Sequence, residues 1–240
     1  MHAAADTVVS TSMELGGNAP VIVLPSADMD LAVEGTLLAK MRNGGSACTA
    51  ANRIYVHDEI HDDFVSRLGQ RLSEIKMGDG LDPSNDLGAL VSVGERDKVA
   101  SLVDTAIDEG AVALLGGTTP AGAGAFYPAT LLTEVRHGST VNSTEIFGPV
   151  SAVVRIHSVE EAIEMANDTE FGLMAYIFAE EESAMRVAPR LESGMVAVNR
   201  GVVSDPAAPF GGMKQSGLGR EGSSEGILEF LEEQYIALNT

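Results

Sequence analysis

The 240-residue chain has the composition of an ordinary soluble globular protein, with 45% hydrophobic and 21% charged residues. Its net charge of -20 repels phosphate backbones and argues against nucleic-acid binding. No apolar run reaches the roughly 20 residues that span a bilayer, so no membrane partner is expected. The single cysteine excludes an internal disulfide and no signal peptide is recognised, which indicates a cytoplasmic location.

The first predicted elements are a strand, a helix and a second strand. The apolar run of residues 20–24 indicates a buried strand. Apolar residues at helical spacing behind a capping sequence predict a helix over 28–43. Asn43 and the glycines after it end that helix, Cys48 follows, and residues 53–57 predict the next strand.

Helices and strands then alternate as far as Asn199. Further helices are predicted over 58–76, 94–109, 158–167 and 181–191, and further strands over 111–115, 129–135, 150–156, 174–179 and 194–198. A Gly-rich loop runs to Gly222, and a helix over 223–232 and a strand over 233–238 complete the chain. This alternation is typical of an α/β domain with a largely parallel sheet.

Cys48 is the one thiol, and it lies between a Gly-rich break and a strand, where a side chain can be exposed at the rim of a sheet. A thiolate is a strong nucleophile once N–H groups or cations lower its pKa. A cysteine is also a small buried hydrophobe, and the residue taken alone favours that interpretation. Glu14 precedes Gly16 and Gly17, which allow a close approach to the backbone, although a solvated acid beside a turn has the same pattern.

Three other motifs carry less information. Glu145 and Phe147 would share one face of an extended segment and could hold a sugar hydroxyl and a flat ring, but Phe147 could equally be core. Residues 217–222 match a dinucleotide fingerprint by letters only, because no strand leads into them. The five histidines lack the companions of a metal site, and there is no Gly-x-Ser-x-Gly elbow, so neither a metal nor a serine hydrolase is expected.

The order of four motifs resembles the aldehyde dehydrogenase superfamily. These motifs are Glu14-Leu15-Gly16-Gly17-Asn18, Cys48, Glu145-Ile146-Phe147-Gly148-Pro149 and Pro209-Phe210-Gly211-Gly212. The resemblance covers essentially the whole chain. It implies a three-layer α/β catalytic domain over 1–200, a Gly-rich active-site loop over 201–222, and a C-terminal helix and oligomerisation strand over 223–240.

The resemblance also implies roles for the site residues. Cys48 resembles the nucleophile that attacks an aldehyde to give a thiohemiacetal and then a thioester, and Glu14 resembles the general base that activates the hydrolytic water. The cofactor would be NAD or NADP. Its contacts would come from the Glu14 motif and from the acid and aromatic of the third motif, which are Leu15, Gly16, Glu145 and Phe147.

Within the superfamily, the chain resembles dehydrogenases that oxidise succinate semialdehyde. Arg42 lies six residues before Cys48, where that group binds the distal carboxylate of the aldehyde, and a guanidinium suits a carboxylate through paired hydrogen bonds. Ser204 and Phe210 are the other expected substrate contacts. Ser46 and Thr144 depart from the superfamily pattern, which has Gln and Glu there.

Superfamily members are much longer at the N-terminus, and residues 4–13 read like the middle of an element. The resemblance therefore implies a truncated chain without its cofactor-binding domain, and a homo-oligomer formed through the last strand. Three functions follow as alternatives: an NAD(P)-dependent dehydrogenase, a non-catalytic oligomerising module, or a thiol esterase that uses Cys48 and Glu14 without a cofactor.

Overall fold

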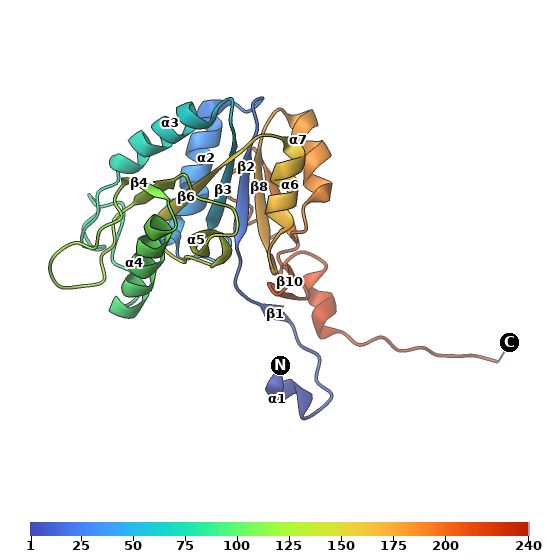
Figure 1. Cartoon of the computed structure of the whole chain (residues 1–240). Helices are drawn as coiled ribbons and strands as arrows, with labels where there is room; N and C mark the ends of the chain where they lie inside the picture. Colours follow the sequence, from blue (N-terminus) through green and yellow to red (C-terminus); the bar gives the residue numbers. More distant parts are fainter. Residues whose placement is uncertain (240) are drawn as a thin grey trace.

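The computed structural model describes residues 1–239 and is built around a seven-stranded sheet with helices on both faces (Figure 1). All neighbouring strands are parallel except the first pair, which is antiparallel. The α/β class with a largely parallel sheet is thus confirmed. In spatial order the strands are β4 (Val112–Leu115), β5 (Thr130–Thr133), β6 (Val150–Ile156), β3 (Ala51–His57), β2 (Ala19–Val23), β8 (Met174–Phe178) and β9 (Met195–Val198).

The helices form the outer two layers because successive side chains of each strand point to opposite faces of the sheet. In β2, Val21 and Val23 belong to one buried apolar cluster and Ile22 belongs to the other. One cluster packs under α2 (Met29–Met41) and α3 (His61–Ser73). The other packs under α4 (Val93–Asp108), α5 (Thr140–Ser143), α6 (Val159–Asn167) and α7 (Glu181–Val187).

Side-chain caps fix where three of these helices begin. Asp28 accepts a hydrogen bond from the N–H of Leu31, Ser92 accepts one from Glu95, and Ser158 accepts one from Glu161. Each cap satisfies a backbone donor that has no partner inside the helix. The predicted helices accordingly start within a few residues of the observed ones, and the largest difference is α3, which is shorter at both ends than 58–76.

Two small antiparallel pairs were not predicted. β1 (Met13–Glu14) pairs with β11 (Gly217–Leu218), and β7 (Phe171–Gly172) pairs with β10 (Met213–Lys214). The first pair joins the Gly-rich loop to the N-terminal segment. Residues 217–222, which match a dinucleotide fingerprint by letters, thus include the strand that pairs with Glu14.

The predicted helix over 223–232 is wrong, since only the short 3-10 helix η3 (Gly226–Phe230) forms there. Short helices depend on packing of an apolar face, and Leu228, Phe230 and Leu231 are exposed instead. Residues 233–238 do not form the predicted strand, because no strand in the described part of the chain lies beside them to complete the hydrogen bonds.

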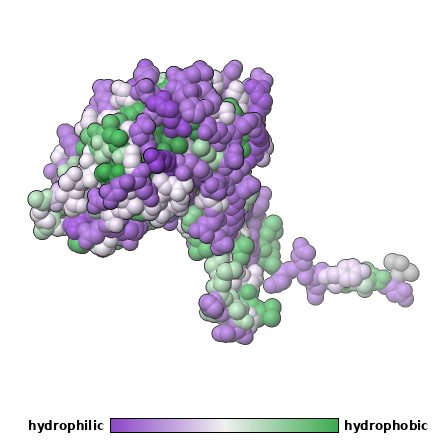
Figure 2. Space-filling model, viewed as in Figure 1, coloured by the Kyte–Doolittle hydropathy of each residue, from purple (hydrophilic) through white to green (hydrophobic). Residues whose placement is uncertain are grey.

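Both terminal segments extend from the main body of the molecule (Figure 1). The N-terminal segment includes the short helix α1 (His2–Ala5), and exposed apolar side chains occur along both segments (Figure 2). Within residues 1–239, no helix is long and apolar enough to cross a membrane.

Candidate active site

Cys48 lies on a tight turn at the end of α2. The short 3-10 helix η1 (Arg42–Gly45) follows α2, and Asn43, Gly44 and Gly45 all have left-handed φ values of 54°, 60° and 76°. The Asn43 side chain donates to the Ser46 carbonyl at 2.7 Å. A Cβ on Gly45 would lie 2.2 Å from the carbonyl oxygen of Gly148, so a glycine is required where these two loops meet.

The Cys48 side chain is partly buried, and its pKa is raised. Burial is the largest cause, and the negative charges of Glu14 and Glu145 act in the same direction. Backbone N–H groups of Cys48 and Thr49 oppose them by stabilising the thiolate. Glu14 and Glu145 therefore both lie within electrostatic reach of the thiol, as a common site requires.

Glu14 is held by the β1–β11 pair, in which it lies opposite Gly217. Both of its carboxylate oxygens are buried and have no hydrogen-bond partner among the described residues. Burial raises the pKa of Glu14, the nearby Glu221 raises it further, and Arg220 lowers it. A buried carboxylate with free lone pairs beside a thiol is suited to accept a proton from a water molecule.

Gly16 and Gly17 lie in a narrow space between Glu145 and the Cys48 loop. The N–H of Gly17 donates to Oε1 of Glu145 at 3.0 Å. A Cβ on Gly16 would lie 2.6 Å from Oε2 of the same carboxylate, and one on Gly17 would lie 2.4 Å from the Cys48 carbonyl oxygen. Leu15 is exposed, and its N–H donates to the Ser216 carbonyl.

Phe147 does not belong to a strand, contrary to the extended segment considered from the sequence. It has a left-handed φ of 54° in the loop before β6, so the alternation of a strand does not relate it to Glu145. The ring is partly exposed, and the Lys98 ammonium lies 5.9 Å from its centroid. Ser46 donates to the Phe147 carbonyl, which again joins this loop to the Cys48 loop.

Arg42 is exposed near Cys48 and donates to the hydroxyl of Thr49 at 3.4 Å. The Tyr176 hydroxyl donates to the Thr49 carbonyl at 2.8 Å, and both Arg42 and Cys48 act electrostatically on it. Burial raises the pKa of Tyr176 to about 12, so the phenol stays protonated and can donate. Arg42, Cys48 and Tyr176 therefore all lie around Thr49.

The other two expected substrate residues lie in the loop after β9. Phe210 packs against the apolar cluster that Cys48 also contacts, and its backbone exchanges two hydrogen bonds with Glu221. A cavity of about 390 Å³ lies between this loop and β9, with Phe210 in its wall. Ser204 is exposed, and no hydrogen bond within residues 1–239 joins it to Arg42.

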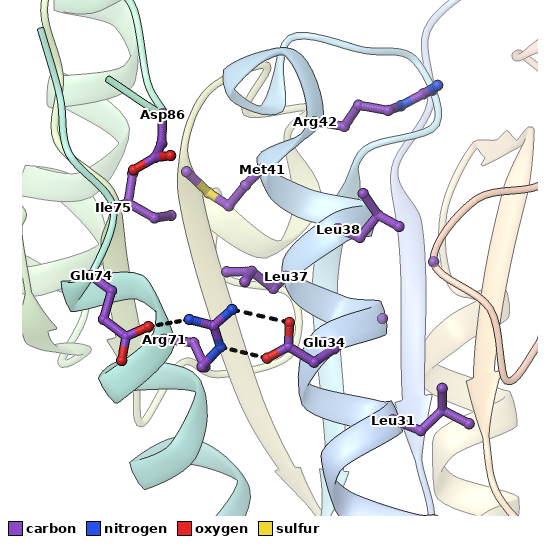
Figure 3. Close-up of a pocket in the computed structure, with 12 residues that line it drawn as sticks. Leu31, Glu34, Leu37, Leu38, Met41, Arg42, Arg71, Glu74, Ile75 and Asp86 are labelled. Carbon is purple, nitrogen blue, oxygen red and sulfur yellow. Dashed lines mark hydrogen bonds and ion pairs between the residues drawn. The ribbon is translucent and has the colours of Figure 1, made fainter. Parts of the chain in front are cut away.

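A larger cavity of about 650 Å³ lies between α2 and α3 and is mainly apolar (Figure 3). Arg71 bridges Glu34 and Glu74 across it, and Arg42 points away from that ion pair (Figure 3). This cavity shares only Arg42 with the candidate site. Cys48, Glu14 and Glu145 do not line it, so the cavity is separate from the proposed catalytic centre. No group of three potential ligand side chains for a metal occurs within the described residues.

Several site residues were not identified from the sequence. Lys98, Tyr176, Arg220 and Glu221 all act on the groups described above. Lys98 lies in α4 and Tyr176 lies in β8, and the sequence patterns of these elements give no sign of a functional role. Arg220 and Glu221 lie inside the 217–222 motif, which was rejected as a dinucleotide fingerprint, and within the expected active-site loop over 201–222, where neither residue was singled out.

Comparison with known proteins identifies the family. The family model described as "Aldehyde dehydrogenase family" matches residues 1–236. The chain belongs to the aldehyde dehydrogenase family. It is 46% identical, over 99% of its length, to a succinate-semialdehyde dehydrogenase of Paenarthrobacter nicotinovorans, of which it covers 53%. It is 43% identical to a glutarate-semialdehyde dehydrogenase of Pseudomonas aeruginosa, again over 99% of the chain and 50% of the relative.

A solved structure of an NADP-dependent Escherichia coli enzyme superposes with a TM-score of 0.94 at 43% identity, covering 97% of this chain and 48% of the other. These relatives confirm the resemblance found in the four motifs. The chain spans about half the length of the aldehyde dehydrogenases it matches.

Proposed function

We propose that this chain carries the catalytic centre of an NAD(P)-dependent dehydrogenase that oxidises an aldehyde with a distal carboxylate, such as succinate semialdehyde. The observation that carries the proposal is the packing of the Glu14-Leu15-Gly16-Gly17 segment between Glu145, which accepts a hydrogen bond from the Gly17 N–H, and the backbone of Cys48. The proposal assigns residues 1–200 to the catalytic domain, 201–222 to an active-site loop and 223–240 to an oligomerisation segment.

Cys48 would supply the nucleophile. Its thiolate would attack the carbonyl carbon of the aldehyde, forming a C–S bond while the carbonyl electrons move to the oxygen. The backbone N–H groups that favour the thiolate would also stabilise the resulting oxyanion of the thiohemiacetal. Loss of a hydride with its electron pair from the same carbon restores the carbonyl and leaves a thioester on Cys48.

Glu14 would act in the second half of the reaction. Its carboxylate would take a proton from a water molecule as the water oxygen attacks the thioester carbon, and the C–S bond would break to return the Cys48 thiolate. The free lone pairs of Glu14 support this role, because no other group in the described residues occupies them.

The residues around Glu145 fit the nicotinamide end of a dinucleotide. Gly16 and Gly17 pack too closely against the Glu145 carboxylate and the Cys48 carbonyl for any side chain, and this packing keeps Glu145 beside the Cys48 loop. The second oxygen of Glu145 makes no hydrogen bond within residues 1–239 and would accept ribose hydroxyls, with the partly exposed Phe147 as the second proposed cofactor contact. When bound, NAD or NADP accepts the hydride.

The distal carboxylate of the aldehyde would bind Arg42, with Ser204 and Phe210 as neighbouring contacts. The named relatives act on succinate and glutarate semialdehydes, which share a carboxylate at the far end from the aldehyde. Replacing Arg42 by Leu is expected to raise KM for succinate semialdehyde about tenfold or more, because a charge-assisted pair is lost. The KM for butyraldehyde, an uncharged aldehyde of equal chain length, should not change; equal effects on both substrates would remove Arg42 from substrate recognition.

The chain would also associate with copies of itself. β9 is an edge strand with no partner on its outer side among residues 1–239, and residues 231–239 are extended, exposed and partly apolar. An extended segment of one copy can complete the open edge of another through backbone hydrogen bonds.

The proposed function is tested by following reduced-nicotinamide absorbance with succinate semialdehyde and NAD or NADP. We expect turnover that disappears in Cys48→Ala. A folded chain whose Cys48 hydrolyses activated esters but reduces neither cofactor would contradict the dehydrogenase proposal and favour the esterase. An oligomer without either activity would favour a non-catalytic module.

A further inference from the structure

Asn52 is a buried carboxamide at the start of β3, four residues after Cys48, and the proposed reaction does not use it. The residue is only 3% exposed. Its Oδ1 accepts the backbone N–H of Ile146 at 3.1 Å, and its Nδ2 donates to the backbone carbonyl of Thr144 at 2.8 Å. One side chain therefore holds the backbone on both sides of Glu145.

The same carboxamide also reaches the segment that carries Gly17. Nδ2 of Asn52 donates to Oδ1 of Asn18 at 2.6 Å, and Asn18 is buried as well. Asn18 follows Gly17, whose N–H donates to Oε1 of Glu145 at 3.0 Å. Hydrogen bonds and covalent bonds thus form a closed ring through these four residues. The ring fixes Glu145 both at its backbone and at one carboxylate oxygen.

The partners of Asn52 explain why an asparagine stands here. The Ile146 N–H requires an acceptor, whereas the Thr144 carbonyl requires a donor. Nδ2 of Asn18 donates to the Asn142 carbonyl at 3.0 Å, which turns the Asn18 oxygen towards Asn52 and requires a second donor there. An aspartate would place lone pairs against two acceptors, and a leucine would leave three buried polar groups without this partner.

We propose that Asn52 is a positioning residue, which sets the backbone of Glu145 so that the carboxylate keeps its contact with the Gly17 N–H and presents its second oxygen to the cofactor ribose. The cofactor role of Glu145 rests on the proposed function, whereas the positioning of Glu145 by Asn52 does not. Because Asn52 follows Cys48 closely in the chain, it also ties the Glu145 loop to the segment that carries the nucleophile.

The positioning is tested by hydrogen exchange of the Gly17 amide, measured by NMR on the full chain. The Gly17 N–H donates to Glu145 and not to Asn52, so its exchange reports the place of the carboxylate. In Asn52→Ala, the Gly17 exchange rate should rise about fivefold or more as Glu145 is released. The amide of Val56, which lies further along β3 between β2 and β6, should change by less than about twofold.

Asn142→Ala is the matched control. Asn142 is as deeply buried as Asn52, and its Oδ1 accepts the Gly138 N–H at 3.2 Å, but its side chain makes no hydrogen bond to residues 144–146 within the described chain. This variant should leave Gly17 exchange unchanged. If Asn52→Ala does not fold, Asn52→Ser takes its place, because a serine hydroxyl is too short to hold both sides of Glu145, and the same rise is expected.

The consequence for the cofactor is tested by steady-state kinetics with succinate semialdehyde. The Asn52 variant should raise KM for NAD or NADP about tenfold and leave KM for the aldehyde within about twofold of the wild-type value. Unchanged Gly17 exchange in a folded Asn52 variant, an equal rise in Asn142→Ala, or an unchanged cofactor KM would overturn the inference. If Gly17 exchange rises in the Asn52 variant while the wild type binds neither NAD nor NADP, the positioning by Asn52 holds and the cofactor part of the proposed function fails.

Discussion

Glu14→Gln is expected to make Cys48 more reactive towards iodoacetamide while strongly reducing aldehyde turnover. The negative charge of Glu14 raises the pKa of the Cys48 thiol, so its removal increases the thiolate fraction. We expect alkylation at pH 8 to be about threefold to tenfold faster, which corresponds to a change of up to one pH unit in the thiol midpoint. Turnover should fall about 10²-fold to 10⁴-fold, because the base for thioester hydrolysis is lost.

The control for this experiment is Glu221→Gln. Glu221 raises the pKa of Glu14 but is not among the groups that act on Cys48, so this variant should leave alkylation unchanged. Slower alkylation in Glu14→Gln would mean that Glu14 itself takes the proton of the thiol, and would reverse the assignment of its role.

Lys40→Met is expected to stabilise the chain strongly at pH 6 and hardly at all at pH 10. Lys40 is buried on α2, which lowers its pKa to about 7 in the folded chain, whereas an unfolded lysine titrates near 10.4. Between these values the unfolded chain binds more protons, so the free energy of unfolding of the wild type rises with pH. The gain in Lys40→Met should therefore shrink by about 4 kcal/mol from pH 7 to pH 10, at about 1.4 kcal/mol for each pH unit.

Urea unfolding at each pH measures this difference, and Lys76→Met is a suitable control because Lys76 is an exposed lysine. The control should change the free energy of unfolding by about 0.5 kcal/mol or less at any pH. A constant difference between Lys40→Met and wild type would show that Lys40 keeps an ordinary titration in the folded chain.

The sequence was sufficient to predict the elements whose signals are local. The strands of the main sheet have apolar runs, so they were predicted. The helices α2, α4 and α6 have capping residues followed by apolar residues at helical spacing, so they were predicted as well. The predictions for residues 223–238 failed because their apolar pattern indicates burial, whereas these side chains are exposed in this chain. The pairs β1–β11 and β7–β10 were missed because two residues are too few to make a pattern.

The candidate site was found through order of motifs rather than through any single residue. Cys48 and Glu14 were ambiguous alone, and their roles remain predictions supported by the effect of the Glu14 charge on the pKa of the Cys48 thiol. Lys40 lies within the helix predicted over 28–43, and nothing in the sequence singles it out. The charge of Glu145, which partly offsets the effect of burial on the Lys40 pKa, lies more than 100 residues away along the chain, and no local pattern reports such a long-range effect.

The left-handed turn before Cys48 has a kinetic consequence for refolding. The turn contacts Gly148, and the site also needs Glu14, which is held in place by Gly217. These segments are separated by about 100 and 200 residues, and contacts that close such long loops form late during folding. The rate of Cys48 alkylation is therefore a reporter of the last stage of refolding, and should reach its native value more slowly than the helical signal in circular dichroism.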